Sequence, residues 1–180
     1  FAVSNKVYSF NGSNNDGKQG EEVIKHYLLN HSNSIKCLPK ITNIEDVSNN
    51  KFYQVQDIDF FVICDKGNVS VEIKTDLQAS KTGNIFFETE SVVELGSKGC
   101  LLASKAEILI YYIPASYTAY FIDLPKFQKW FRDNSYKFPP KTVQNYSHTT
   151  KGKLISIEKL EQMFSYYEKV TDVIWSVEEN

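Results

Sequence analysis

Hydrophobic positions recur at helical spacing near the start of the chain. Val23, Ile24, Tyr27 and Leu28 follow acidic residues suited to a helix start, so we expect a first helix over residues 17–29. The pattern that follows indicates a break in the helix at 30–34, a short strand at 35–41 and a polar loop at 43–51.

Runs rich in apolar and aromatic residues then indicate strands. Segments 52–64 and 68–75 are joined by Asp65-Lys66-Gly67, which favours a tight turn and predicts a hairpin. Segment 107–113 is apolar after its first residue, as expected for a central strand covered on both faces. The remaining elements are expected to be strands at 84–89 and 117–122, helices at 98–105, 124–133 and 158–167, and a loop at 137–150. This order predicts one α/β domain over residues 1–180, with a central mixed sheet flanked by helices.

Composition narrows the function only slightly. The chain has 180 residues, 42% of them hydrophobic and 23% charged, as is usual for a globular protein in water. No apolar run approaches the roughly 20 residues that span a bilayer, and the start lacks a secretory signal pattern, so a cytoplasmic location is expected. The net charge of −2 does not itself indicate nucleic-acid binding, although an acidic metal site would lower the local charge.

Two acids and a lysine are brought together by the predicted hairpin. Asp59 lies in the segment QDIDFFV, and Glu72 and Lys74 lie in VSVEIK. Side chains alternate along a strand, so Glu72 and Lys74 share one face. The chain's cysteines and histidines show no ligand spacing, and any metal is therefore expected to be held by oxygen.

This set of groups suits phosphodiester hydrolysis. Asp59 and Glu72, with the backbone carbonyl of Ile73, could hold Mg²⁺ or Mn²⁺, because hard cations prefer oxygen ligands. A divalent cation makes water more acidic, and an ammonium group such as that of Lys74 can orient the nucleophile and offset charge on the phosphate.

Together these residues resemble the PD-(D/E)XK nucleases of the restriction-endonuclease-like fold, over a catalytic core of residues 17–113. The segment from Gly17 to Glu21 (GKQGE) is similar to the helix opening of the Holliday-junction-resolvase-like branch, which implies Glu21 as a further catalytic acid and metal ligand. The resemblance implies a Mg²⁺-dependent DNA endonuclease that leaves 5′-phosphate and 3′-hydroxyl ends. It also implies branched or structured DNA as substrate and a homodimer as the active form. The alternatives are a sequence-specific restriction-type enzyme, and a nucleic-acid-binding or protein-interaction module without turnover.

The sequence leaves the roles of some residues near this motif open. The family motif has proline where Ile58 stands. Asp57, expected on the same strand face as Asp59, could be a ligand, a supporting group or a solvated neighbour, and Asp59 is preferred because an apolar run follows it. Glu21 shares the helical stripe of the core residues, where a carboxylate needs compensation by a metal or by Lys74.

Other residues receive weaker interpretations. The acids Glu88 and Glu90 are expected on the solvent face of a strand. Phosphate contacts are possible at three lysines, Lys81, Lys98 and Lys105. Core positions, rather than base-stacking ones, are expected for Phe60, Phe61, Phe86, Phe87, Tyr111 and Tyr112. The part after Ile122 is interpreted as a substrate or dimer surface, with Trp130, Arg132 and residues 137–141 as its candidates.

Overall fold

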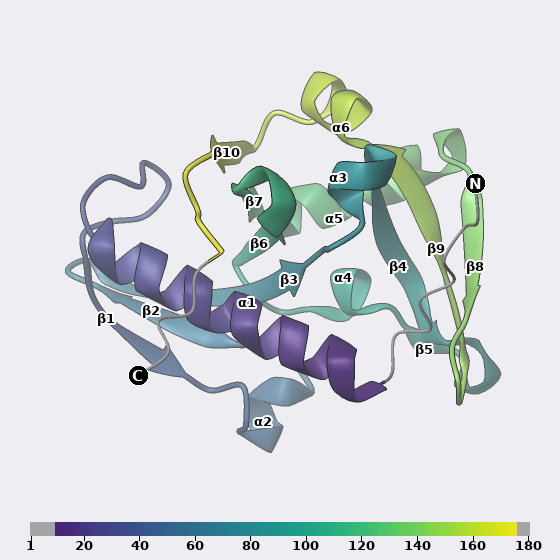
Figure 1. Cartoon of the computed structure of the whole chain (residues 1–180), viewed down its shortest axis with the longest axis horizontal. Helices are drawn as coiled ribbons and strands as arrows, with labels where there is room; N and C mark the ends of the chain where they lie inside the picture. Colours follow the sequence, from purple (N-terminus) through teal and green to yellow (C-terminus); the bar gives the residue numbers. More distant parts are fainter. Residues whose placement is uncertain (1–9, 176–180) are drawn as a thin grey trace.

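A mixed six-stranded sheet forms the centre of the protein in the computed structural model, which describes residues 10–175 (Figure 1). The strand order is β1-β2-β3-β6-β7-β10. The bounds are Ile41–Asp46, Phe60–Cys64, Gly67–Thr75, Ile108–Ile113, Thr118–Asp123 and Tyr167–Val170. Strands β3 and β6 are parallel and the other neighbours are antiparallel. The predicted hairpin over β2 and β3 and the central position of β6 are confirmed.

Helices cover both faces of this sheet. Helix α1 (Phe10–Asn30) packs Val23, Ile24 and Leu28 against one face, in a hydrophobic cluster that includes Val71 and Ile73 of β3. The other face carries helix α5 (Leu124–Asn134) in a second cluster. Because the apolar sides of both helices are used in this way, the sheet is buried on its two faces and the protein is α/β.

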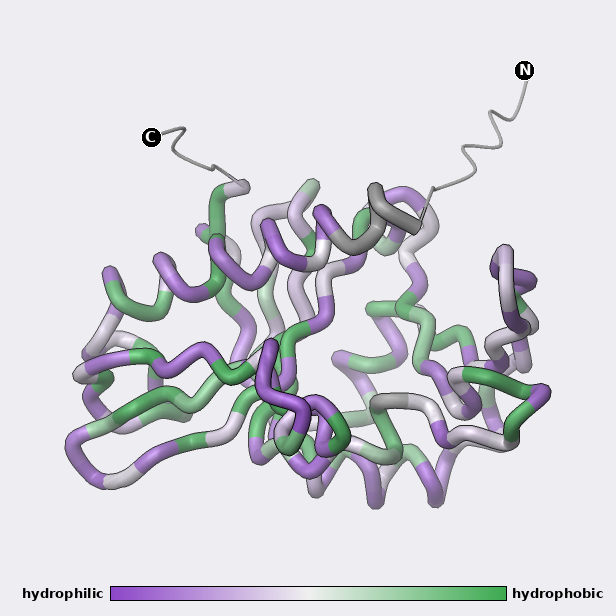
Figure 2. The backbone as a smooth tube through the Cα atoms, turned by 90° about the horizontal axis from the view of Figure 1, so that it is seen from below, coloured by the Kyte–Doolittle hydropathy of each residue, from purple (hydrophilic) through white to green (hydrophobic). Residues whose placement is uncertain are grey.

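A second sheet stands beside the first. It has the order β5-β4-β9-β8, with the bounds Ser97–Lys98, Asn84–Val92, Thr149–Ser156 and Pro140–Gln144. Ile85, Phe87 and Ile155 pack into the same cluster as α5, which joins the two sheets. Figure 2 shows the six-stranded sheet on the left and the smaller sheet on the right, with α1 passing above.

Short helices complete the described part of the chain. They are α2 (Lys51–Gln54), α3 (Ala79–Thr82), α4 (Cys100–Ala103) and α6 (Ile157–Met163), with 3-10 turns at Val93–Leu95, Pro114–Ser116 and Ser135–Lys137. Between residues 10 and 175, no helix has the length and apolar character that crossing a membrane requires.

Several expected boundaries were wrong. Residues 35–40 are not a strand, and the segment 43–51 is not a loop throughout, because Ile41 and Ile44 are buried and β1 pairs with β2. Segment 52–54 is helical rather than extended. The expected loop 137–150 contains β8 and the start of β9. These two strands pair with each other although β8 is mostly exposed and polar. The last expected helix ends at Met163, and β10 follows it.

Candidate active site

Glu72 and Lys74 project from the face of β3 that is turned away from α1. The parallel register places Glu72 beside Leu109 and Lys74 beside Tyr111, whereas Ile73 points to the α1 side. Glu72 is only 7% exposed. The Lys74 Nζ atom lies 3.9 Å from Glu72 Oε1, so the two groups form an ion pair at the edge of the core.

Asp59 is fixed against the backbone of β3. It directly precedes β2, and its backbone N–H donates to the carbonyl of Val71 at 2.9 Å. Its Oδ2 atom accepts a hydrogen bond from the Ile73 N–H at 2.8 Å. These two hydrogen bonds therefore fix the position of the Asp59 carboxylate beside Glu72. Ile73 meets Asp59 through its N–H, and a metal-ligand role for the Ile73 carbonyl stays a prediction.

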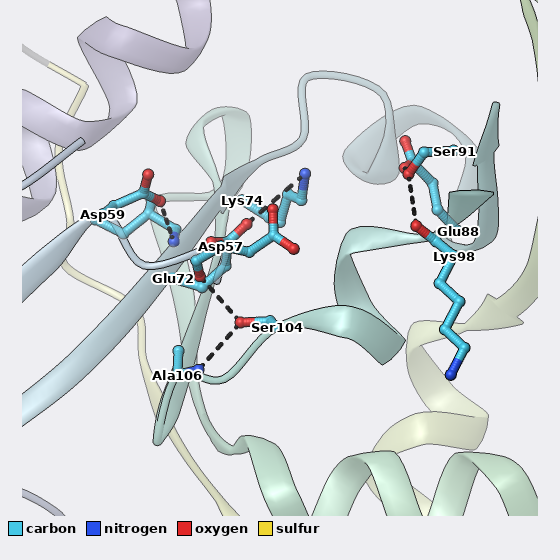
Figure 3. Close-up of polar contacts among 10 residues, drawn as sticks. Asp57, Asp59, Glu72, Lys74, Glu88, Ser91, Lys98, Ser104 and Ala106 are labelled. Carbon is cyan, nitrogen blue, oxygen red and sulfur yellow. Dashed lines mark hydrogen bonds and ion pairs between the residues drawn. The ribbon is translucent and has the colours of Figure 1, made fainter. Parts of the chain in front are cut away.

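Asp57 does not share a strand face with Asp59, and that expectation was wrong. It follows α2 with a φ of 50°, a left-handed conformation that Asp tolerates better than most residues. Its N–H donates to the Gln54 carbonyl at 3.1 Å, and its carbonyl accepts from Ser104 Oγ at 3.0 Å. This turn places Asp57 next to Glu72 and Lys74, with Asp59 to their left (Figure 3).

Glu21 approaches the acids from the other side of the sheet. It lies on α1, which packs on the opposite face from Glu72, and it is half-buried. Burial, and then the nearby charges of Asp59 and Asp46, raise the pKa of Glu21 to about 7, while Lys18 opposes this. Lys18, one turn earlier on the same helix, is thus the cation whose charge acts on Glu21. Compensation of Glu21 by a metal stays a prediction.

Burial and mutual repulsion make the carboxylates costly to ionise together. Burial raises the pKa of Glu72 well above its usual value; Lys74 lowers it, and Asp59, Asp57 and Glu21 raise it further. Burial likewise raises the pKa of Asp59 and of Asp57, with Lys74 again opposing the shift. Because several acids share the charge of one lysine, an added cation would stabilise their ionised forms.

The donor set suits a hard divalent cation with few protein ligands. Within residues 10–175, no three or more His, Cys, Asp or Glu side chains are grouped closely enough to hold a metal ion. However, Mg²⁺ is commonly bound by one or two carboxylates and keeps several waters. Asp59, just before β2, and Glu72 on the neighbouring strand β3 fit that pattern, and the repulsion among the acids favours it. Glu21 and Ile73 stay predicted ligands.

A cavity of about 490 Å³ opens in front of Glu72 and Lys74. It lies between the face of β3 and β6 and the second sheet, and the first turns of α1 reach its rim at Asp16 and Gly17. Its lining also includes Asn84, Phe86, Glu88, Ser104, Lys141 and Leu154. Glu72 and Lys74 on β3 therefore form part of the wall of this cleft.

Neither a protein-family model, nor a curated protein, nor a solved structure matches this chain. The resemblance to PD-(D/E)XK nucleases thus rests on the residues of the sequence that carry it. Asp46, which lies near Glu21, escaped the sequence reasoning because it stands in no local motif. Ser104 donates its hydroxyl to the Asp57 carbonyl 47 positions earlier in the chain, a contact that neighbours in sequence do not indicate.

Glu21 should give the stability of the metal-free protein a pH dependence. Its folded-state pKa of about 7 exceeds the ordinary glutamate pKa of 4.5, so wild type loses stability relative to Glu21→Gln as pH rises from 4.5 to 7. In EDTA, we expect Glu21→Gln to melt higher than wild type at pH 8 and nearly equal to it at pH 4. Thermal unfolding across this range measures the difference.

The matched control is Glu22→Gln, which removes an exposed carboxylate one position along the same helix. Its melting temperature should differ from that of wild type by an amount that does not change with pH. A constant difference for Glu21→Gln as well would contradict the raised pKa.

Proposed function

We propose that the chain is a metal-dependent DNA endonuclease of the PD-(D/E)XK type with a restriction-endonuclease-like fold. The observation that carries this proposal is the position of Glu72 and Lys74, paired at 3.9 Å on the wall of a cleft, with Asp59, just before the adjacent strand β2, fixed to the backbone of β3. Acid and lysine in these positions suit hydrolysis of a phosphodiester. Branched or structured DNA, cut by a homodimer, is the substrate we favour.

The proposed roles follow from where each group lies. A bound Mg²⁺ would neutralise charge on the scissile phosphate and make a nearby water more acidic. Asp59 and Glu72 would hold it, and the buried position of Glu72 excludes bulk water that would weaken the electrostatics. Lys74 is 41% exposed at its side chain, which lets its ammonium reach the attacking water or the phosphate. Asp57 would keep that ammonium oriented.

Cleavage of a labelled panel of linear, flapped and four-way DNA with Mg²⁺ or Mn²⁺ tests the function. We expect wild type to cut at least one member and to leave 5′-phosphate ends. Glu72→Ala and Lys74→Ala should lower the rate by about 10²–10³-fold or more, because each removes charge stabilisation at the reacting phosphate.

The matched controls are Glu45→Ala and Lys66→Ala, exposed residues of the six-stranded sheet and its hairpin turn. Both should cut as wild type does. Inert wild type with both metals, or equal rates for wild type and the two active-site variants, would refute the proposal. A contaminating nuclease is recognised because all variants would share its activity.

A further inference from the structure

Phe86 occupies an unexpected position for an aromatic residue inside a strand. Its neighbours on β4, Ile85 and Phe87, are buried in the cluster that joins the two sheets. Phe86 points the other way, is half-buried, and belongs to neither hydrophobic cluster of the described residues. It lines the same cavity as Glu72 and Lys74. Its ring is therefore part of the cleft wall rather than of the core.

Gly152 on β9 leaves room for this ring. A Cβ atom at Gly152 would lie 2.5 Å from Phe86 Cε2 and 2.3 Å from the Phe87 carbonyl oxygen, closer than real contacts allow. The ring thus lies across the glycine. Leu154, paired with Phe86, and Val143 on β8 line the cavity beside it. Together these side chains make an apolar surface with an aromatic face, of the kind on which nucleic-acid bases stack.

Lys141 adds a cation to the same wall. It is exposed on β8, pairs with Gly152, and lines the cavity. Paired residues of antiparallel strands share a face, and so do residues two positions apart on one strand. Lys141 pairs with Gly152, and Phe86 pairs with Leu154 two positions further along β9. Lys141 and Phe86 therefore lie on the same side of the second sheet. Among the residues lining the cavity, lysines therefore stand on both sides, Lys74 on β3 and Lys141 on β8. Lys81, Lys98 and Lys105, which the sequence left as possible phosphate contacts, do not line it.

We propose that this wall holds one unpaired nucleotide of the substrate, with its base stacked on Phe86 and its phosphate beside Lys141. The next phosphate would then reach Glu72 and Lys74. A cavity of about 490 Å³ is the size of a small-molecule pocket, which suits a nucleotide and is too small to enclose a duplex. The proposal rests on the proposed nuclease function and specifies its substrate class: DNA with unpaired nucleotides beside the cut, such as a flap or an open junction.

Equilibrium binding without metal tests this arrangement separately from cleavage. Fluorescence anisotropy in EDTA would compare the full chain on a labelled single-stranded oligonucleotide and on a duplex of the same sequence. Phe86→Ala should weaken single-strand binding by about 5- to 150-fold, the usual effect of losing one stacked base. Phe86→Tyr should keep most of the affinity, and duplex binding should change little. Lys141→Ala should reduce the salt dependence of single-strand binding by about 0.7 in the log–log slope.

The matched control is Phe52→Ala, which removes a phenylalanine that is 68% exposed on α2 and lies outside the cavity. It should bind both oligonucleotides as wild type does. Unchanged single-strand affinity in Phe86→Ala, equal weakening on single strand and duplex, or a wild type that binds no single strand would overturn the inference. If Phe86→Ala fails to fold, Lys141→Ala decides, because that side chain is exposed and an unchanged slope also overturns the inference.

The outcomes separate this inference from the proposed function. If Phe86→Ala loses single-strand binding while wild type cleaves no DNA, the nuclease function is refuted and the nucleotide-binding wall is supported. If wild type cleaves DNA but Phe86→Ala binds single strands as wild type does, the nuclease function is supported and the nucleotide-binding wall is refuted.

Discussion

Replacing Glu72 with glutamine is expected to abolish cleavage and at the same time to stabilise the metal-free protein. Glutamine keeps the shape of the side chain and removes its charge. Burial raises the pKa of Glu72, so the folded state of wild type loses stability as pH rises above the usual value of a glutamate, and glutamine does not share this loss. Lys74, at 41% side-chain exposure, stays solvated when its partner becomes neutral.

The expected gain is about 0.5–2 kcal/mol in the free energy of unfolding at pH 8, the usual range for a stabilising substitution. At pH 4 the gain should disappear, because wild-type Glu72 is then protonated in both states. Chemical unfolding in EDTA at the two pH values measures it, and cleavage with Mg²⁺ is measured on the same samples.

The control is Glu45→Gln, an exposed glutamate on β1, which should change neither property. A Glu72→Gln protein that is less stable than wild type at pH 8 would show that the carboxylate supports the fold. Retained cleavage would remove Glu72 from the proposed mechanism.

The local pattern of apolar and turn residues was sufficient to predict the central strands of the fold. The turn at Asp65 to Gly67 joins two apolar strands, and the continuous apolar run of β6 marks a strand with helices or sheet on both sides. These signals depend on neighbours in sequence and on burial. The same pattern placed Glu72 and Lys74 on one face, since alternation along a strand is a property of the backbone.

The second sheet could not be predicted in this way. Strand β8 begins with a proline and exposes Lys141, Thr142 and Gln144, so it shows no apolar alternation. It exists because β9 supplies its hydrogen bonds, and β9 in turn pairs with β4. Phe86 was interpreted as core for a related reason: an aromatic residue within a strand is usually buried, and only the cavity lining and its absence from both hydrophobic clusters of the described residues show that it faces the cleft.

Candidate-site residues on strands were easier to place than those on turns. The alternation rule assigned Asp57 to the face of Asp59, but α2 and the left-handed conformation of Asp57 rotate its side chain toward Lys74. Its support by Ser104 is a contact between distant segments. Glu21 was placed on the correct helix, yet the nearby charges of Asp59 and Asp46 depend on which face of the sheet that helix covers, and sequence spacing does not specify this.

Replacing Gly20 with alanine is expected to destabilise the protein and to displace Glu21. Gly20 is buried where α1 crosses β3, and a Cβ atom there would lie 1.9 Å from Thr75 Oγ1 and 2.9 Å from Thr75 Cβ. Rotation of the threonine side chain cannot move its own Cβ, so α1 must shift away from the sheet. Such overpacking costs about 1–3 kcal/mol, and for a chain of this size the melting temperature should fall by about 2–12 °C.

Gly17→Ala is the matched control, because Gly17 lies on the same helix one turn earlier and a Cβ atom there meets nothing within 4 Å. Alanine favours a helix over glycine by up to about 1 kcal/mol, so this variant should melt slightly higher than wild type. The two substitutions thus have opposite expected signs although they add the same methyl group to one helix. If Gly20→Ala also melts higher, α1 does not make this close contact with β3, and the route by which Glu21 reaches Asp59 must be different.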